Sequence, residues 1–385
     1  MSDNPLRRIY LDHAATSYPK PPQVLETISH YIQFEGASAG RGAYQEAYEA
    51  KRELEEVRQK LARLFNIPQS NRIVFTLNAT DALNLAIKGM LNEGDHVIVS
   101  SLEHNSVSRP LNALQNTRGI SFTKIDCDLD GNFNEEDLEK ALRSNTRLLI
   151  FLHGSNVSGT LLPIPLIGEF AERKGLPLLV DASQTAGSFP IDVQGMKISM
   201  LAVPGHKGLL GPLGTGALWV REGIELEPLR EGGTGSFSEE DTQPLFWPDR
   251  YESGSHNQVG LVGLSAALDF ILMKGVDSIR HHKKILLQQL LEGLLPLKQI
   301  RCIAPQNIEH NAGVLSLQLS SDSPQDFSMR LDEEFQVQVR PGLHCAPWAH
   351  SSFNTLSTGT VRLSLGYSNT SDEIDAAIRA IYQLV

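Results

Sequence analysis

The sequence has few cysteines, no long apolar run and no excess of positive charge, and each shortage excludes a class of protein. Its 385 residues include three cysteines, Cys127, Cys302 and Cys345, too few and too scattered for a disulfide framework. A net charge of −11 argues against general affinity for nucleic acid or an anionic membrane surface. Apolar runs such as LLIFL and LPLLV have the length of strands, not of membrane spans. Because the N-terminus also lacks the apolar region of a secretory signal, we expect a cytoplasmic protein.

Sequence motifs typical of nucleotide-binding and metal-binding sites are missing as well. No Gly-x-Gly-x-x-Gly follows the first expected strand and no Gly-Lys-Thr/Ser loop occurs, so nucleotide binding has little support. His344, Cys345 and His350 lie close in sequence, but no second paired motif completes a tetrahedral set, so we expect no metal. Cys127 ends an expected strand and Cys302 lies in a short apolar run, and both are interpreted as structural.

Short β-rich runs alternate with helical patterns through most of the chain. Residues 46–67 repeat apolar residues on one helical face, and runs such as RIVFTLN, DHVIVSSL and ISMLAVPGH read as strands. This alternation predicts an α/β fold with a mostly parallel sheet covered by helices. We expect an N-terminal segment over 1–30, a large domain over 31–258 and a smaller C-terminal α+β domain over 259–385. The last of these includes one long helix from about residue 259 and a final helix opened by the capping box Thr370–Glu373.

Four polar features follow expected strands, where open α/β sheets bind their ligands. They are Asp181 with Gln184 in DASQ, Lys207 in PGHKG, Thr80 at a helix start in NATDAL, and Glu103–His104 in SLEHNS. Taken singly, each has a structural explanation: a helix cap, a solvated lysine, an N-cap hydroxyl and a satisfied histidine. Together they supply a lysine amine, an acid behind a strand and a helix N-terminus suited to phosphate. These are the groups that pyridoxal phosphate requires, for its Schiff base, its ring nitrogen and its phosphate.

The order of these motifs resembles the cysteine desulfurase family, which belongs to the class V aminotransferases and the fold type I pyridoxal-phosphate enzymes. The resemblance runs from IYLDHAATSYPKP through NATDALNLAI, EHNSV, NVSGT, DASQ and GHKG to RPGLHCAP and VRLSLGYSNTSDEID. It covers nearly the whole chain. It implies a large domain with a mostly parallel seven-stranded sheet, a smaller domain that carries the cysteine loop, and a homodimer.

The resemblance also implies a role for each matching residue. Lys207 would form the Schiff base and Cys345 would take sulfur from the substrate, while His104 would stack on the ring and relay protons. The cofactor would further contact Asp181, Gln184, Thr80, Ala79, His206, Asn156 and, from the neighbouring subunit, Ser255. Arg362, whose planar fork suits a carboxylate, would bind the substrate with Asn156 and Arg340.

The reaction implied is the conversion of L-cysteine to L-alanine. Cys345 would carry the persulfide and pass it to a thiol sulfur-acceptor protein, and His344 and Arg340 would favour the Cys345 thiolate if they lie close. Selenocysteine lyase, cysteine or cystine C–S lyase, aminotransferase and epimerase reactions remain alternatives, and so does a scaffold without a cofactor. The acceptor and the pathway, whether iron–sulfur cluster assembly, thiolation or selenium metabolism, stay open.

Some positions depart from the family pattern. Pro204 replaces a hydroxyl residue before Gly-His-Lys, Ala79 and Ser255 each stand where threonine is usual, and Tyr44 stands where histidine is frequent. Pro341 replaces the threonine of Arg-Thr-Gly-x-His-Cys. Because proline fixes φ and restricts the residue before it, we hypothesise a stiffer loop around Cys345.

Overall fold

The centre of the molecule is a seven-stranded sheet. The structure is a computed structural model that describes residues 8–39, 42–236 and 239–385. The strand order is β2 (Ile73–Thr76), β8 (Gly216–Val220), β7 (Met200–Pro204), β6 (Leu178–Asp181), β5 (Thr146–Leu152), β3 (His96–Ser100) and β4 (Ser121–Ile125). Strands β7, β6, β5, β3 and β4 run parallel, whereas β8 is antiparallel to both β7 and β2. The mostly parallel seven-stranded sheet expected from the sequence is therefore confirmed.

Helices cover both faces of this sheet because successive strand residues point to opposite sides. Leu148 and Ile150 of β5 belong to the buried cluster formed with α3 (Ala79–Met90) and α4 (Asn105–Arg118). Leu149 and Phe151 belong to the cluster on the other face, formed with α2 (Gln45–Phe65), α6 (Ile164–Lys174) and α7 (Gln258–Lys274). Helix α5 (Glu135–Ala141) lies beyond β4, and α1 (Pro22–His30), continued by a π-helical turn at Tyr31–Glu35, packs on α7.

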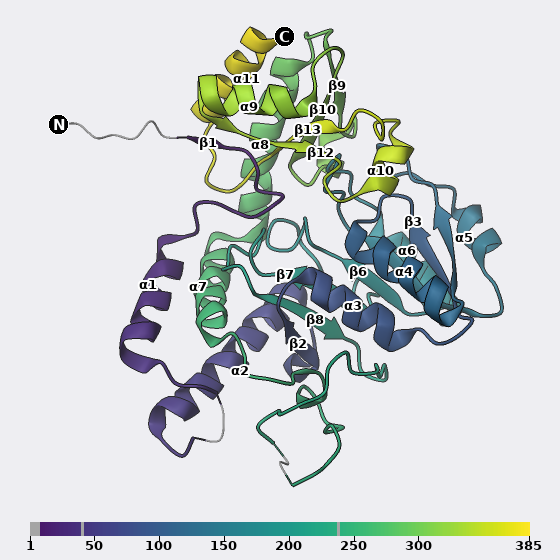
Figure 1. The fold of residues 1–385 in the computed structure, drawn as a ribbon, viewed down its shortest axis with the longest axis vertical. Helices are drawn as coiled ribbons and strands as arrows, with labels where there is room; N and C mark the ends of the chain where they lie inside the picture. Colours follow the sequence, from purple (N-terminus) through teal and green to yellow (C-terminus); the bar gives the residue numbers. More distant parts are fainter. Residues whose placement is uncertain (1–7, 40–41, 237–238) are drawn as a thin grey trace.

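A four-stranded antiparallel sheet forms the other end of the molecule (Figure 1). Its order is β12 (Arg340–Gly342), β13 (Thr360–Ser364), β10 (Val314–Leu319) and β9 (Ile300–Ile303). Helices α8 (Val276–Leu294), α9 (Pro324–Phe335) and α11 (Ser371–Leu384) pack around it, and α10 (Pro347–Ser352) follows the cysteine loop. A two-stranded sheet joins β1 (Ile9–Tyr10) to β11 (Val337–Gln338), so the N-terminal segment runs beside this part of the chain. The capping box Thr370–Glu373 opens α11 as expected.

One local expectation was wrong. The long helix expected from residue 259 is broken: α7 ends and α8 begins at Gly275, whose φ is +84°, and the two helices meet at a bend of 79°. Glycine adopts this φ without the steric cost that a side chain brings. The RPG stretch ahead of Cys345 forms β12. Proline is tolerated there because β12 is the edge strand of its sheet.

Within the described part of the chain, no single helix has the length and apolar character needed to cross a membrane. Only α7 and α8 taken together reach that threshold, by length and composition alone.

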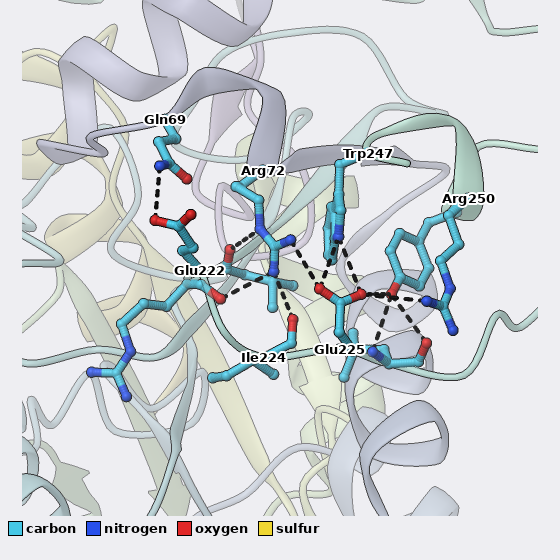
Figure 2. A network of polar contacts seen from close by, with 11 residues as sticks. Gln69, Arg72, Glu222, Ile224, Glu225, Trp247 and Arg250 are labelled. Carbon is cyan, nitrogen blue, oxygen red and sulfur yellow. Dashed lines mark hydrogen bonds and ion pairs between the residues drawn. The ribbon is translucent and has the colours of Figure 1, made fainter. Parts of the chain in front are cut away.

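The long connection between β8 and α7 is fastened to the start of β2 (Figure 2). The Arg72 guanidinium lies 3.6 Å from the centre of the Trp247 ring and donates to the Ile224 carbonyl at 2.6 Å. Arg72 also forms an ion pair with Glu225 at 3.3 Å, and Glu225 pairs with Arg250 at 3.4 Å. Stacking and charge together fix this connection on the sheet.

Candidate active site

A cavity of about 470 Å³ opens at the carboxyl ends of the parallel strands. Asp181 ends β6, Lys207 follows β7 and His104 follows β3. Of the predicted site residues, those that line this cavity are Ala79, Thr80, His104, Asn156, Asp181, Gln184, His206 and Lys207. The structure therefore brings together eight side chains spread over more than a hundred residues of sequence.

Lys207 sits in a tight turn directly after β7. Gly205 makes the turn possible, because a Cβ atom at that position would lie 2.1 Å from Oγ1 of Thr215. Pro204 ends the strand and itself lines the cavity, so no hydroxyl is supplied at that point. Burial lowers the pKa of the Lys207 amine to about 8, against a smaller opposing effect of Asp181. An amine with a lowered pKa is a better nucleophile and base near neutral pH.

Asp181 is 4 % exposed and its Oδ1 accepts a hydrogen bond from the backbone N–H of Ser183 at 2.9 Å. Gln184 lies one turn further on and donates through Nε2 to the Ala14 carbonyl at 3.1 Å. Beneath them, burial raises the pKa of the Glu103 carboxyl to about 8, and Glu103 accepts from Leu152 N–H at 2.8 Å. Glu103 is thus neutral near pH 7, which leaves Asp181 as the carboxylate of the cavity.

The N-terminus of α3 faces the same cavity. Asn78 caps this helix by accepting from the Asp81 N–H at 2.9 Å, so the helix starts at Ala79 and Thr80. Thr80 shares a hydrogen bond of 2.7 Å with the hydroxyl of Ser106. Free N–H groups at a helix start, with a hydroxyl beside them, form an anion site.

His104 caps the next helix, α4. Its Nδ1 accepts from the backbone N–H of Ser106 at 3.0 Å and lies 2.9 Å from the Ser106 hydroxyl, which fixes the ring. Burial, followed by the charge of Lys207, lowers the pKa of His104 to about 4. The ring is therefore neutral near pH 7, a state that suits stacking against an aromatic group.

Arg362 lies on β13 with 2 % of its surface exposed, and its guanidinium pairs with Asp12 at 2.8 Å. It also donates to the Asn156 carbonyl at 3.1 Å. Strand pairing sets Arg340 directly opposite Arg362. The charges of both arginines, after burial and Asp181, affect the pKa of Lys207. This brings the predicted substrate-binding residues to the border of the cavity, although Arg362 and Arg340 do not line it.

Cys345 lies on a short loop beside this border. His344 and Cys345 adopt left-handed backbone conformations, with φ of 49° and 57°. The loop is held by Asn105, whose N–H donates to the Cys345 carbonyl at 2.8 Å, and by Asn156, whose Nδ2 donates to the His344 carbonyl at 2.6 Å. The Cys345 side chain is exposed and lines a separate, outward-facing cleft. Burial lowers the pKa of His344 to about 2, so His344 is neutral and supplies no charge to the thiol.

Ser255 does not lie in the Lys207 cavity of its own chain. It lines another cavity together with Phe75, Arg230 and His256, behind the ends of β2 and β8. The prediction that Ser255 reaches the phosphate of a neighbouring subunit stays a prediction.

The other two cysteines are placed differently from Cys345. Cys127 is buried, and burial raises the pKa of its thiol to about 12. Burial likewise raises the pKa of Cys302 to about 11. Among the described residues, no three His, Cys, Asp or Glu side chains are grouped so that they could hold a metal ion.

Three contributors were missed in the sequence. Ser106 links His104 to Thr80, Asp12 pairs with Arg362, and Lys20 donates to the His206 carbonyl at 2.7 Å. Ser106 could have been found as a hydroxyl in the first turn of an expected helix. Asp12 and Lys20 carry no local signal, because their partners are far away in the sequence.

The cavity fits pyridoxal phosphate by the chemistry of its donors. Two buried polar atoms on its wall, Oδ1 of Asn156 and Nδ1 of His206, lack a hydrogen-bond partner among the described residues. Lys207 supplies an amine, Asp181 an acid and the start of α3 an anion site. A bound cofactor with a phosphate, a ring nitrogen and a ring hydroxyl would satisfy these groups.

Comparison with known proteins agrees with this geometry. Residues 9–377 match the family described as aminotransferase class-V. A probable cysteine desulfurase of Methanothermobacter thermautotrophicus is 37% identical, over 97% of this chain and 94% of that protein. This chain belongs to the cysteine desulfurase family of the class V aminotransferases. That family is generally dependent on pyridoxal phosphate.

Other cysteine desulfurases are similar over almost their whole length. The protein of Salmonella agona is 30% identical, over 99% of this chain and 94% of that protein. The apo structure of the cysteine desulfurase from Thermococcus onnurineus NA1 has a TM-score of 0.92 at 30% identity, covering 98% of this chain and 94% of that one. The cysteine desulfurase CsdA of Escherichia coli has a TM-score of 0.87 at 27% identity, with 98% and 94% covered. These likenesses confirm fold type I.

Proposed function

We propose that this enzyme is an L-cysteine desulfurase that releases L-alanine and carries the sulfur as a persulfide on Cys345. The observation that carries the proposal is the position of the Cys345 loop. Asn156 holds the His344 carbonyl through its side chain and the Arg362 guanidinium through its own carbonyl. One residue thus connects the exposed thiol to the arginine expected to bind the substrate carboxylate.

We infer that pyridoxal phosphate binds in the Lys207 cavity, where it would supply the electron sink for chemistry at the substrate Cα. Lys207 would hold it covalently and would then move a proton at the substrate Cα. Asp181 would keep the ring nitrogen protonated, and Gln184 would donate to the ring hydroxyl. The first turn of α3 would bind the phosphate through backbone N–H groups and Thr80.

Substrate binding depends on Arg362 and Asn156, with Arg340 nearby. The Arg362 fork would bind the substrate carboxylate, and the neutral ring of His104 would cover the cofactor and relay a proton. The Cys345 thiolate would attack the substrate sulfur and form a new S–S bond. The C–S bond would break, and its electron pair would stay on the substrate carbon, which takes up a proton on the way to alanine. A thiol acceptor protein then takes the outer sulfur.

We also propose the domain organisation, the oligomeric state and the cellular location of the enzyme. We propose an N-terminal segment at 1–30, a cofactor domain at 31–258 and a cysteine-loop domain at 259–385. The separate seven-stranded and four-stranded sheets support two domains, although α7, at the start of the last range, packs on the seven-stranded sheet. A homodimer is supported by apolar side chains exposed on and near α1 and α2, namely Leu25, Ile32, Phe34 and Tyr48. It would bring Ser255 to the phosphate of the partner subunit. We further propose a cytoplasmic enzyme that delivers sulfur for processes such as iron–sulfur cluster assembly.

The decisive experiment incubates the purified enzyme with L-cysteine and a reducing thiol, and measures alanine and sulfide. Lys207→Ala should lose both products, because no other amine in the cavity replaces it. Cys345→Ser should lose most alanine formation, while Cys302→Ser, which alters a cysteine outside the site, should keep it.

Each alternative predicts a different outcome. If Cys345→Ser released sulfide at the wild-type rate, a C–S lyase would replace the desulfurase. Faster turnover of selenocysteine, with cysteine barely consumed, would indicate a selenocysteine lyase. Amino-group transfer to a keto acid would indicate an aminotransferase.

A further inference from the structure

The cleft outside Cys345 has an unusual charge for this protein. It has a volume of about 1030 Å³ and is lined by Asn105, Ser108, Arg109, Asn112, Arg340, Pro341, Leu343, His344, Cys345, Pro347 and Trp348. These described residues include two arginines and no carboxylate, in a chain whose net charge is −11. A local cationic site on an acidic protein selects for a negatively charged partner.

The two arginines of this cleft are available to a ligand. Neither the Arg109 nor the Arg340 side chain forms an ion pair or a hydrogen bond with another described residue. Arg109 is exposed on the first turns of α4, the helix whose first N–H holds the Cys345 carbonyl. Its charge reaches the site, since it lowers the pKa of His104. Burial, Lys207 and Arg362 lower this pKa more strongly, and Asp181 opposes them. Arg109 is therefore close to the reacting groups without being used by them.

The remaining wall of the cleft resembles the centre of a protein interface. Trp348 lies against Phe122, with 5.5 Å between ring centres, and Lys124 adds a third cation 5.0 Å from the Trp348 ring centre. Leu343 is 37% exposed beside it. Tryptophan and arginine surrounded by polar groups are the residues that contribute most to protein–protein binding.

A ligand in this cleft meets Cys345 from outside. The cleft shares no lining residue with the cavity of Lys207, Asp181 and Gln184. Its occupant therefore reacts with the sulfur after Cys345 has received it. We propose that the cleft selects a protein acceptor whose cysteine is flanked by acidic residues, and that Arg109 is the main determinant of this specificity. The inference rests on the proposed role of Cys345 as the sulfur carrier.

The transfer step needs no further reagent. The thiolate of the acceptor attacks the outer sulfur of the Cys345 persulfide and forms a new S–S bond. The bond between that sulfur and Cys345 Sγ breaks, and Sγ leaves as a thiolate with the electron pair. Arg109 and Arg340 would hold the carboxylates of the acceptor, while the N-terminus of α4 stabilises the departing thiolate.

The test uses peptides that differ only in charge. Three five-residue peptides carry a central cysteine flanked on each side by glutamate, glutamine or lysine. Cys345 is converted to its thiopyridyl disulfide in a Cys302→Ser background, so that neither L-cysteine nor the cofactor reaction is needed. The release of thiopyridone measures the rate at which each peptide reacts with the enzyme. This rate is divided by the rate of the same peptide with a small thiopyridyl disulfide, which removes differences in the reactivity of the peptide thiols.

We expect the acidic peptide to react faster than the neutral one, and the basic peptide to react slowest. The expected advantage is about fivefold for each charge that reaches an arginine, the attraction of unit charges about 4 Å apart in water. It should shrink at 0.5 M salt. Arg109→Gln should remove most of it, and Arg109→Lys should keep most of it. Arg147→Gln, which removes an exposed arginine at the amino end of β5, away from the carboxyl ends of the parallel strands, should leave it unchanged.

Equal normalised rates for the three peptides would overturn the proposal, and so would an acidic preference that persists in Arg109→Gln. Either result would leave the desulfurase function itself untouched, because that is measured separately from alanine formation. Conversely, charge selectivity in an enzyme that forms no alanine would remove the sulfur-transfer role and retain the binding site.

Discussion

Arg362 and Asp12 form an ion pair of 2.8 Å although 350 residues separate them in the chain. The guanidinium expected to bind the substrate carboxylate is therefore already paired with a carboxylate of the protein. Arg362 is 2 % exposed, whereas the side chain of Asp12 is 21% exposed. Asp12 thus neutralises and orients a buried cation while its own oxygens stay near solvent.

We predict that Asp12→Asn lowers the free energy of unfolding by about 3 kcal/mol, because it leaves a buried arginine without its charge partner. L-Alanine, the expected product, carries a carboxylate that can replace the missing one. It should raise the melting temperature of Asp12→Asn by more than that of the wild type. Thermal unfolding with and without alanine measures both effects, and equal increments in the two proteins would contradict the prediction.

Lys20 should act as a positioning residue for Lys207. Its Nζ donates to the His206 carbonyl, which also accepts from Thr16 Oγ1 at 3.0 Å and from Ser17 N–H at 3.1 Å. Among the residues that the structure describes, Lys20 is the only charged side chain that donates to the His206 carbonyl, and Lys20→Met removes this hydrogen bond, worth about 2 kcal/mol.

We therefore expect Lys20→Met to release pyridoxal phosphate faster and to shift its absorption spectrum, with KM for cysteine changed less than kcat. Lys20→Arg restores a charged donor and serves as the control. A Lys20→Met enzyme with the wild-type spectrum and release rate would show that the contact is only structural.

Pro341 should stiffen the loop that carries Cys345. It lies on edge strand β12 opposite Val361, one residue before Gly342, whose φ is +106°. Pro341→Thr should increase hydrogen exchange of the amides at 342–346, lower the free energy of unfolding by about 0.5–1 kcal/mol and change the persulfide-transfer rate. Unchanged exchange and transfer rates would remove the hypothesis.

Acid should destabilise this enzyme well above the pH at which ordinary carboxyl groups titrate. Seven histidines have a pKa below the usual 6.5, and burial is the largest cause for each of them. The pKa is lowered to about 4 for His96, His104, His153, His206 and His350, to about 3 for His13 and to about 2 for His344. A depressed pKa means that the unfolded chain binds more protons, so stability is lost as the pH falls from 6.5 toward 4. Each histidine adds a slope of about 1.4 kcal/mol per pH unit.

Glu103 is a single group with the opposite effect on the pH dependence of stability. Its pKa is raised to about 8, so it releases its proton on unfolding. Urea unfolding at pH 7.5, 6.5 and 5.5 measures the net slope. His153→Gln should lower the proton uptake on unfolding at pH 5.5 by about one. A stability that stays flat down to pH 5 would contradict the prediction.

The sequence was sufficient to predict those site residues whose position follows from a local pattern. Asp181 is the last residue of a short buried strand, and Lys207 and Thr80 follow such strands within a few residues; parallel strands bring their carboxyl ends to one edge. The break at Gly275 was missed because the apolar pattern continues across it. The contacts Asp12–Arg362 and Asn105–Cys345 join segments far apart in sequence, and no propensity or periodicity encodes such a pairing. Likewise, the charge of the Cys345 cleft depends on side chains from α4 and β12, which only folding brings together.

The contacts between the N-terminal segment and strands β11 and β13 also set an order in which parts of the fold can form during synthesis. The segment from Asp12 to Lys20 contacts Arg362, Gln184 and the turn of Lys207, while β1 pairs with β11. A ribosome makes this segment long before its partners on β11 and β13. A nascent chain can therefore assemble the cofactor cavity of the large sheet early, but the substrate side closes only after Arg362 has emerged. Substrate binding thus waits for a strand that is made well after the residues of the cofactor cavity.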